Sequence, residues 1–201
     1  MPQLVLGTHN KHKGEEFKVL LGDLSVETLT LEQFPQVGEI VEDGETLEEN
    51  ARKKAKEVFR ITHLSTLADD SGLEVHYLND EPGVYSSRYA GPEATYPDNC
   101  KKLLSKLRGV PPRRRGARFR CVLYFIAPGN VRFSTEGVCN GVILESPRGT
   151  NGFGYDPIFL PRGWSKTLAE MTPQEKNLIS HRAKAVEAIK PHLRSYFPAV
   201  T

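Results

Sequence analysis

Residues 4–10 read Leu-Val-Leu-Gly-Thr-His-Asn, a short apolar run that ends in a polar turn. Between residues 13 and 21, Phe17, Leu20 and Leu21 lie on one side of a predicted helix. The chain therefore begins with a strand, a polar turn and a helix. In open α/β sheets ligands bind where strands end and helices begin, so this segment predicts both an α/β fold and a first place for a ligand.

The following segments continue the alternation of helices and strands. Thr46 and Glu49 form a capping box, which predicts that a helix with an apolar stripe begins here. Short strands are predicted at 66–68 and 73–78. The sequence Asp-Asp-Ser-Gly at 69–72 predicts a turn between these two strands.

The second half of the chain predicts a helix, a long hairpin and a final helix. Thr95 is expected to cap the first of these helices. Long strands are predicted at 118–127 and 131–144, joined by a turn at 128–130 that contains Pro-Gly-Asn. One last helix is expected to start at Thr172, which is followed by proline at the first helical position.

Length and composition describe an ordinary globular chain. It has 201 residues, 38% of them hydrophobic and 26% charged, which excludes a mostly disordered or fibrous protein. No apolar run approaches the ~18 residues that a membrane helix needs. We expect one α/β domain over residues 1–201, divided into two lobes, with no membrane segment.

Charge and cysteine content bear on partners and location. The formal net charge is only +2, from 27 basic and 25 acidic residues, so the chain as a whole gives no case for a polyanionic partner. Cys100, Cys121 and Cys139 are odd in number and widely spaced. Free thiols in a reducing cytosol fit this pattern better than disulfides or a zinc site, so we expect a cytoplasmic protein.

Several familiar nucleotide and hydrolase motifs are absent from the sequence. It contains no G-x-x-x-x-G-K-[ST], no H-E-x-x-H and no G-x-S-x-G. Residues 152–157, Gly-Phe-Gly-Tyr-Asp-Pro, only approach the dinucleotide-binding pattern and precede no helix start. A Walker phosphate loop and a dinucleotide fold are therefore excluded.

The turn after the first strand has the groups that bind an anion. A strand-to-helix turn exposes backbone N–H groups, Thr8 and Asn10 add side-chain donors, and Lys13 adds a full charge. The alternative interpretation is ordinary capping of the helix by polar residues. Position in the sequence does not decide between the two.

Asp69 and Asp70 are the sharpest chemical feature of the sequence. Two adjacent acids between apolar strands are typical of a Mg²⁺ site, since this cation prefers oxygen ligands. The alternative is an Asx turn with a solvated neighbour. The acidic run at 39–49 is mostly a solvated face, although one member could be a further metal ligand.

A second group of polar residues lies late in the chain. Residues 153–156, Phe-Gly-Tyr-Asp, offer an aromatic plane, a close backbone approach and an acceptor. Lys176, His181 and Arg182 follow in the predicted last helix. His181 and Arg182 are neighbours and point about 100° apart on a helix, so we expect that they do not both face the core.

Residues 113–120 contain a basic cluster with five arginines, three of them consecutive. A nucleic-acid-binding module is one hypothesis for this cluster. We favour a solvated loop at Arg113–Arg115, with Arg118 and Arg120 on an exposed strand face. The near-neutral charge and the lack of interleaved aromatic residues support this interpretation.

Six segments, in order along nearly the whole chain, resemble the inosine triphosphate pyrophosphatase family, which acts on noncanonical purine nucleoside triphosphates. Any one segment is weak evidence, but six in order are very improbable by chance. They are 8–13, Thr-His-Asn-Lys-His-Lys; 42–51, Glu-Asp-Gly-Glu-Thr-Leu-Glu-Glu-Asn-Ala; 68–73, Ala-Asp-Asp-Ser-Gly-Leu; 82–91, Pro-Gly-Val-Tyr-Ser-Ser-Arg-Tyr-Ala-Gly; 152–157, Gly-Phe-Gly-Tyr-Asp-Pro; and 180–182, Ser-His-Arg.

This resemblance implies both a fold and a reaction. The implied fold is a single α/β chain with a long curved mixed sheet flanked by helices, in two lobes with a nucleotide cleft between them. The implied enzyme is a Mg²⁺-dependent homodimer that converts ITP, dITP or XTP to the monophosphate and pyrophosphate. Such an enzyme removes deaminated purine nucleotides from the pool. A pyrophosphatase for other modified nucleotides is the related alternative.

The resemblance also implies roles for individual residues. Glu42 and Asp70 match the metal ligands, and Asp70 matches the general base, although the sequence does not separate Asp69 from Asp70 in that role. The implied substrate-binding residues are Thr8, His9, Asn10, Lys11, His12, Lys13 and Lys54 for the phosphates, Ser71 as a further contact, and Phe153, Gly154, Tyr155, Asp156, Lys176, His181 and Arg182 for the base.

Overall fold

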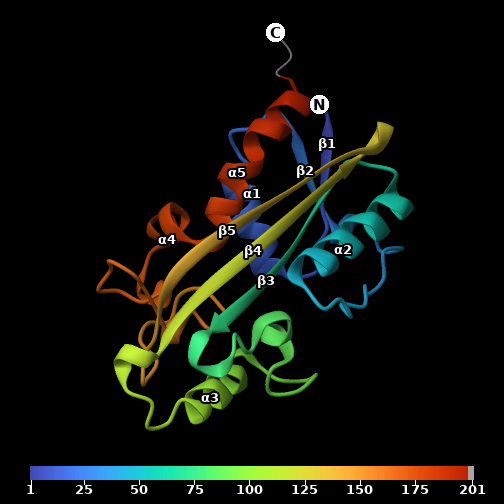
Figure 1. Ribbon diagram of the computed structural model, residues 1–201. Coiled ribbons are helices and arrows are strands. Elements are labelled where there is room, and N and C mark those ends of the chain that lie inside the picture. The colour runs from blue at the N-terminus through green and yellow to red at the C-terminus, as the bar shows by residue number, and fades with distance from the viewer. Residues whose placement is uncertain (199–201) are drawn as a thin grey trace. The chain divides into compact units, whose positions relative to one another are not determined.

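The computed structural model describes residues 1–198 (Figure 1). Six strands form one sheet in the order β2-β1-β3-β4-β5-β6. The strands are β1 (Gln3–Leu6), β2 (Glu27–Thr30), β3 (Thr66–Val75), β4 (Gly116–Ala127), β5 (Val131–Ile143) and β6 (Phe159–Pro161). The helices are α1 (Lys11–Leu20), α2 (Leu47–Thr62), α3 (Tyr96–Lys106), α4 (Pro173–Ile179) and α5 (His181–Tyr196).

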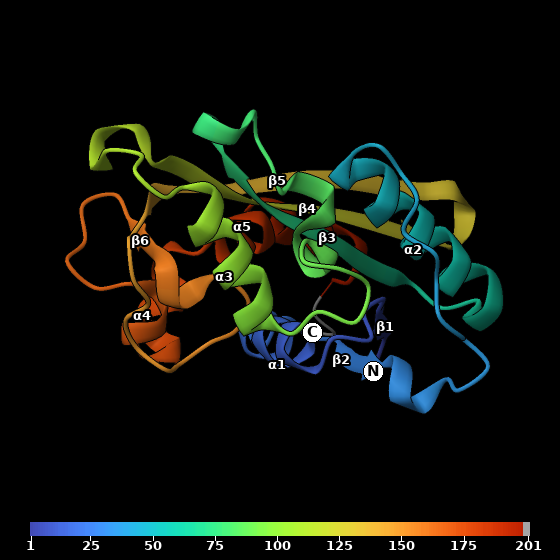
Figure 2. The ribbon, with the colours of Figure 1, turned by 90° about the horizontal axis from the view of Figure 1, so that it is seen from below.

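The sheet is mixed. β1 pairs in parallel with both β2 and β3, whereas β5 and β6 pair in antiparallel fashion. β4 and β5 are neighbours in the sheet and run side by side as the two longest strands (Figures 1 and 2). The prediction of an α/β fold with a mixed sheet flanked by helices is confirmed.

The chain divides into two compact units. Of the described residues, unit 1 contains 1–70, 121–137 and 182–198, and unit 2 contains 71–120 and 138–181. β3, β4 and β5 contribute residues to both units. No helix among residues 1–198 is long and apolar enough to cross a membrane.

The core of unit 1 is arranged by the alternation of side chains along β1. Leu4 and Leu6 pack in a cluster with Phe17 of α1 and Ile189 of α5. Val5, between them in the sequence, packs in a separate cluster that includes residues of β2 and α2. Because both faces of β1 are covered, its sequence is an apolar run, as is usual for an interior parallel strand.

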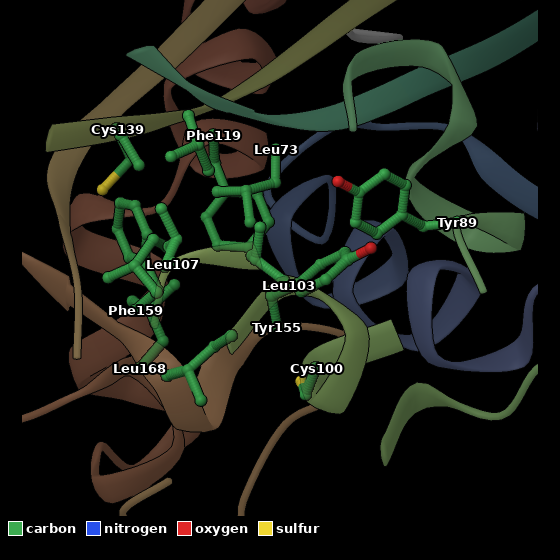
Figure 3. Close-up of a cluster of buried hydrophobic side chains, with 14 of the residues drawn as sticks. Leu73, Tyr89, Cys100, Leu103, Leu107, Phe119, Cys139, Tyr155, Phe159 and Leu168 are labelled. Atoms are coloured by element: carbon green, nitrogen blue, oxygen red, sulfur yellow. The ribbon is translucent and has the colours of Figure 1, made fainter. Parts of the chain in front are cut away.

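The core of unit 2 is a single cluster of apolar and aromatic side chains (Figure 3). α3 contributes Leu103 and Leu107, and β4 contributes Phe119. The ring centre of Phe119 lies 4.7 Å from that of Phe159 on β6. Tyr155, from the glycine-rich loop that precedes β6, belongs to the same cluster. The loop is therefore anchored to the core at this residue.

The predicted turn at 69–72 is wrong. β3 runs without interruption from Thr66 to Val75, through both aspartates. The prediction was based on the local sequence Asp-Asp-Ser-Gly, which is typical of a turn. In the structure Asp69 and Asp70 are buried and each accepts a hydrogen bond from a lysine, so no solvent-exposed turn is required.

The predicted last helix is two helices. Its start is confirmed, since Thr172 accepts a hydrogen bond from the Glu175 amide and Pro173 opens α4. However, Ser180 adopts an extended conformation (φ −64°, ψ 154°) and ends α4, and α5 begins at His181. Leu178, near the end of α4, is exposed.

Most other predicted elements are confirmed. Thr46 caps α2 by accepting from the Glu49 amide, and Thr95 caps α3. The turn at Pro128–Asn130 joins β4 to β5 as expected. The end of β5 at Ile143 differs from the prediction by one residue.

Candidate functional site

The turn after β1 is shaped by its own polar side chains. The side-chain oxygen of Asn10 accepts a hydrogen bond from the Lys13 amide (3.2 Å) and so caps α1. Thr8 Oγ1 accepts one from the Asn10 amide (3.2 Å). These contacts match the capping interpretation of Thr8 and Asn10, and they fix the backbone from which Lys13 projects.

Three other predicted phosphate-binding residues lie at the surface around this turn. His9 is exposed, and its Nε2 lies 3.1 Å from the Gly38 carbonyl oxygen. Lys11 is exposed and pairs with Glu32 at 3.1 Å. His12 is exposed in the first turn of α1. All three are accessible to a ligand from solvent.

Two lysines hold three carboxylates together in unit 1. Lys13 Nζ donates to Asp69 Oδ2 at 2.8 Å. Lys54 Nζ donates to Glu42 Oε1 at 2.7 Å and to Asp70 Oδ1 at 3.2 Å. We call these five residues the acid–lysine cluster. Its members come from α1, the loop before α2, α2 itself and β3.

A fully buried amide orients one carboxylate of the acid–lysine cluster. Asn50 Nδ2 donates to Asp70 Oδ2 at 3.2 Å, while Asn50 Oδ1 accepts from the Gly44 amide at 2.8 Å. A Cβ at Gly44 would lie 2.7 Å from that Oδ1, so only glycine fits here. Asn50 therefore links the acidic loop to Asp70.

The pKa values of the two adjacent aspartates are shifted in opposite directions. Burial alone would raise the pKa of Asp69, but the charges of Lys13, Lys54 and Arg182 outweigh burial and hold that pKa well below its usual range. Burial dominates for Asp70 and raises its pKa, even though Lys54 and Lys13 oppose the shift. Asp70 is thus the more basic carboxylate.

Lys54 stays charged although it is buried. Burial alone would lower its pKa, but the negative charges of Asp70, Asp69 and Glu42 raise the pKa above the ordinary lysine value. The ammonium group is therefore the counterion of the buried carboxylates.

Arg182 and His181 are both buried, contrary to the expectation that only one of them faces the core. They begin α5, where different elements cover them. The Arg182 guanidinium pairs with Glu16 and lies over the Phe17 ring, 5.5 Å from its centre. The His181 ring stacks on Phe119 with ring centres 4.7 Å apart. The 100° between them directs each side chain to a different part of the core.

Within unit 2, Asp156 organises the glycine-rich loop. Its Oδ2 accepts hydrogen bonds from the Phe153 amide (3.0 Å) and from Lys176 Nζ (2.7 Å). Lys176 Nζ lies 4.8 Å from the centre of the Phe153 ring, a cation–π distance. Asp156 and Lys176 are both buried, so this arrangement holds Phe153 through its backbone and its ring.

The rest of this loop is held by the core of unit 2. Tyr155 Oη donates to the Ser86 carbonyl at 2.9 Å, and burial raises the pKa of Tyr155. The Gly154 carbonyl accepts from the Cys100 thiol at 3.4 Å. Ser71, the first residue of unit 2, is partly buried on β3.

A cavity of about 890 Å³ lies beside this loop within unit 2. α3 lines it with Tyr96 and Cys100, and the loop lines it with Phe153 and Gly154. The rings of Tyr96 and Phe153 have centres 5.9 Å apart. Phe153 therefore has Lys176 near its ring as well as an open space beside it.

The arginine cluster is not a solvated loop throughout. Arg115 is buried and donates three hydrogen bonds to main-chain carbonyls of Leu107, Ile143 and Leu144. Arg118 and Arg120 both pair with Glu74. Three of the five arginines thus have hydrogen-bonding or ion-pair partners within the chain, and Arg114 lies over the Tyr77 ring, 4.7 Å from its centre, which weakens the nucleic-acid hypothesis.

The acid–lysine cluster offers two carboxylates to a cation. Among residues 1–198, no group of three or more His, Cys, Asp or Glu side chains is arranged to hold a metal ion. Glu42 and Asp70 do lie close together, because both bond to the same ammonium nitrogen. Two carboxylates suit a cation that also takes water and phosphate ligands.

Asn50 and Glu16 belong to the site but had no role in the sequence-based prediction. Asn50 could have been found, because it lies on the buried stripe of α2 with Ala51, Lys54 and Val58. A polar residue and a lysine on an apolar stripe need partners in the core. Glu16 gives no such signal, since its partner is 166 residues away.

The fold and these contacts define a class: an α/β protein with a capped strand-to-helix turn, buried carboxylates and paired lysines, which can bind a polyanion together with a cation. The chain belongs to the Ham1 family, whose sequence model matches residues 4–192.

Known proteins resemble the chain over nearly its full length. A dITP/XTP pyrophosphatase of Geobacter sulfurreducens is 48% identical over 96% of this chain and 97% of its own. One from Bacillus subtilis is 43% identical over 97% and 98%. A solved HAM1 protein of Coxiella burnetii, 42% identical, superposes with a TM-score of 0.88 over 97% of this chain and all of its own.

Proposed function

We propose that this chain hydrolyses the deaminated purine nucleoside triphosphates ITP, dITP and XTP to the monophosphate and pyrophosphate, with Mg²⁺. Its relatives named dITP/XTP pyrophosphatase support the reaction and the substrate class, because the alignments cover both chains almost end to end. Within the structure, the single observation that carries the proposal is the acid–lysine cluster.

The phosphates bind to the turn after β1 and to the lysines. Lys13 and Lys54 are charged donors from two different helices, and Lys11, His9 and His12 add further donors at the surface. The backbone amides at the start of α1 lie at the positive end of the helix dipole, which favours an anion there. Thr8 and Asn10 keep this turn in shape.

Glu42 and Asp70 would hold Mg²⁺. They fit this cation because they are hard oxygen donors, close together, and few enough to leave positions for water and phosphate oxygens. Asn50 keeps Asp70 in its orientation. When bound, Mg²⁺ supplies Lewis acidity toward the phosphate oxygens and offsets their charge.

Asp70 is the general base of the proposed reaction. A water molecule attacks the α-phosphorus, its proton passes to an Asp70 oxygen, and the bond from that phosphorus to the bridging oxygen of pyrophosphate breaks. The raised pKa of Asp70 makes it a better proton acceptor than Asp69, whose pKa is depressed. This difference supports Asp70 over its neighbour.

Most of the residues that we assign to base recognition belong to unit 2. Phe153 offers a ring for stacking, and Asp156 and Lys176 fix its position. Hypoxanthine and xanthine have a 6-oxo acceptor where adenine has a 6-amino donor. A protein donor aimed at that position, from His181, Arg182 or the loop backbone of residues 153–156, faces another donor when ATP binds, and such a mismatch is worth up to ~10⁴ in discrimination.

We further propose that the enzyme is a cytoplasmic homodimer. Three free cysteines, all buried, fit a reducing compartment. A house-cleaning enzyme that acts on nucleotides scattered through the cell has no need of a membrane or a nucleic-acid partner.

The test is a hydrolysis panel of ITP, dITP, XTP, ATP, GTP and dTTP with Mg²⁺, in which pyrophosphate and orthophosphate are assayed separately. We expect pyrophosphate from the first three, and almost none from Asp70→Asn. Orthophosphate would place the attack at the γ-phosphorus and contradict the mechanism. No turnover of any of the six nucleotides would favour the alternative, a pyrophosphatase for other modified nucleotides.

A further inference from the structure

Lys54 lies where a cation would lie. Its ammonium nitrogen is 2.7 Å from Glu42 and 3.2 Å from Asp70, the two carboxylates assigned to Mg²⁺ above. The Lys54 side chain is only 8% exposed, so the contact is not a transient surface pair. The site thus already contains a positive charge, supplied by the protein.

We propose that Lys54 is a stand-in cation, which keeps the metal site closed to free Mg²⁺ until a triphosphate draws its ammonium group away from Glu42 and Asp70. This inference rests on the proposed function, since it takes the same two residues as metal ligands. It adds an order to binding: the metal ion enters with the nucleotide rather than before it.

The physical reason is the balance of charge around the two carboxylates. Two acids this close together repel each other, and Asp70 is buried, so the pair is costly without a counterion. Lys54 supplies that counterion in the free enzyme. A divalent cation that entered beside the ammonium group would meet a like charge at a few ångströms. It would also gain less, because the ammonium group already offsets part of the negative charge of the two acids.

A triphosphate changes this balance. It has several negative charges and many acceptor oxygens, so it offers the ammonium group a new partner. Lysine suits the exchange because its charge sits at the end of a flexible four-carbon stem. The backbone of Lys54 stays fixed in α2, and Asn50, one helical turn earlier, continues to hold Asp70.

The test compares Lys54→Met with wild type in the absence of nucleotide, with Mn²⁺ as the paramagnetic substitute for Mg²⁺. Free Mn²⁺ is counted by its electron paramagnetic resonance signal. We expect wild type to bind Mn²⁺ weakly. Lys54→Met should bind Mn²⁺ at least about tenfold more tightly, because a like charge is removed from the site. Lys54→Arg keeps the charge and should not bind more tightly than wild type.

Lys53→Met is the matched control. Lys53 is the preceding residue of α2 and pairs with Asp43 at 2.5 Å, but its side chain is 44% exposed and it does not contact Glu42 or Asp70. Its removal takes the same charge from the chain, so a general electrostatic effect would appear in both variants. We expect the Mn²⁺ affinity of Lys53→Met to match wild type.

A second measurement tests the same inference through stability, in case Lys54→Met folds poorly. The melting temperature is taken with and without saturating MgCl₂, and the rise should be larger for Lys54→Met than for wild type. Equal rises and equal Mn²⁺ affinities would overturn the inference while the proposed function stands. If wild type takes up no Mn²⁺ even with ITP present, the proposed metal role itself fails.

Discussion

Asp69 and Asp70 are neighbours in the sequence, yet their carboxyl groups have pKa values shifted in opposite directions. Successive residues of a strand point to opposite faces. Burial raises the pKa of both carboxyl groups. The charges of Lys13, Lys54 and Arg182 outweigh burial at Asp69, whereas at Asp70 the two lysines do not, because the charges of Glu42 and Asp69 add to the effect of burial. The alternation of a strand gives one carboxylate a structural role and leaves the other basic.

Cys100 gives a prediction about pH at the residue scale. Burial, followed by the nearby charge of Asp156, raises the pKa of its thiol to about 12. The thiol of the unfolded chain ionises near its ordinary pKa. Above that pH ionisation stabilises the unfolded state, so the free energy of unfolding falls. The stability contributed by the neutral thiol is therefore complete below about pH 8.5 and decreases toward pH 12.

The measurement is urea unfolding of wild type and Cys100→Ser between pH 7 and pH 11. The difference in unfolding free energy between the two proteins should shrink as the pH rises, because serine does not ionise. A difference that stays constant across this range would mean that Cys100 is not a buried neutral thiol.

At the scale of elements, the glycine-rich loop depends on one close approach. Gly152 has φ +73°, and a Cβ there would lie 2.1 Å from Asp156 Oδ2, the atom that holds Phe153 and Lys176. Gly163 has a similar φ of +84° but nothing within 4 Å of its Cβ position. Alanine would therefore cause backbone strain at both positions, but a steric conflict only at Gly152.

We expect Gly152→Ala to displace Asp156 and to raise the KM for ITP about tenfold, with a smaller change in kcat, because the base platform moves while the acid–lysine cluster is untouched. Gly163→Ala should cost about 1 kcal/mol of stability from backbone strain alone and leave KM unchanged. Steady-state kinetics and urea unfolding of both variants check this. Similar KM values for the two variants would contradict the role given to Asp156.

The start signals of elements were predictable from sequence, and their ends were less so. Thr46, Thr95 and Thr172 cap their helices as predicted, because a cap needs only residues within one turn. The break at Ser180 was not predicted. No proline or glycine marks it, and it depends on where His181 and Arg182 find partners far along the chain.

At the scale of the whole molecule, three strands contribute to both compact units. β3 is the clearest case: Asp70 closes the first segment of unit 1 and Ser71 opens unit 2 within one unbroken strand. The proposed roles largely follow this division: the phosphate and metal residues belong to unit 1, and the base residues belong to unit 2 except for Arg182, with which the last segment of unit 1 begins. The prediction of a single domain over residues 1–201 stays a prediction.

The proposed homodimer is a prediction at this scale. We expect light scattering coupled to size exclusion to give twice the 22.5 kDa mass of the chain at micromolar concentration. Measurement at several concentrations and at low and high salt separates a stable dimer from weak association. A mass of one chain throughout that range would contradict the proposal.

The sequence by itself determined the fold class and the family, because these depend on local patterns: apolar periodicity, helix caps and short motifs in order. The same motifs proposed most positions of the candidate site. Only the tertiary structure decided which groups meet. In the structure Asp69 and Asp70 are buried within a strand, and Lys54 pairs with Glu42 and Asp70. Arg115 is buried and bonds to main-chain carbonyls. The reason is that a charge can be buried only where a partner from elsewhere in the chain offsets its lost hydration, and sequence patterns do not encode that partner.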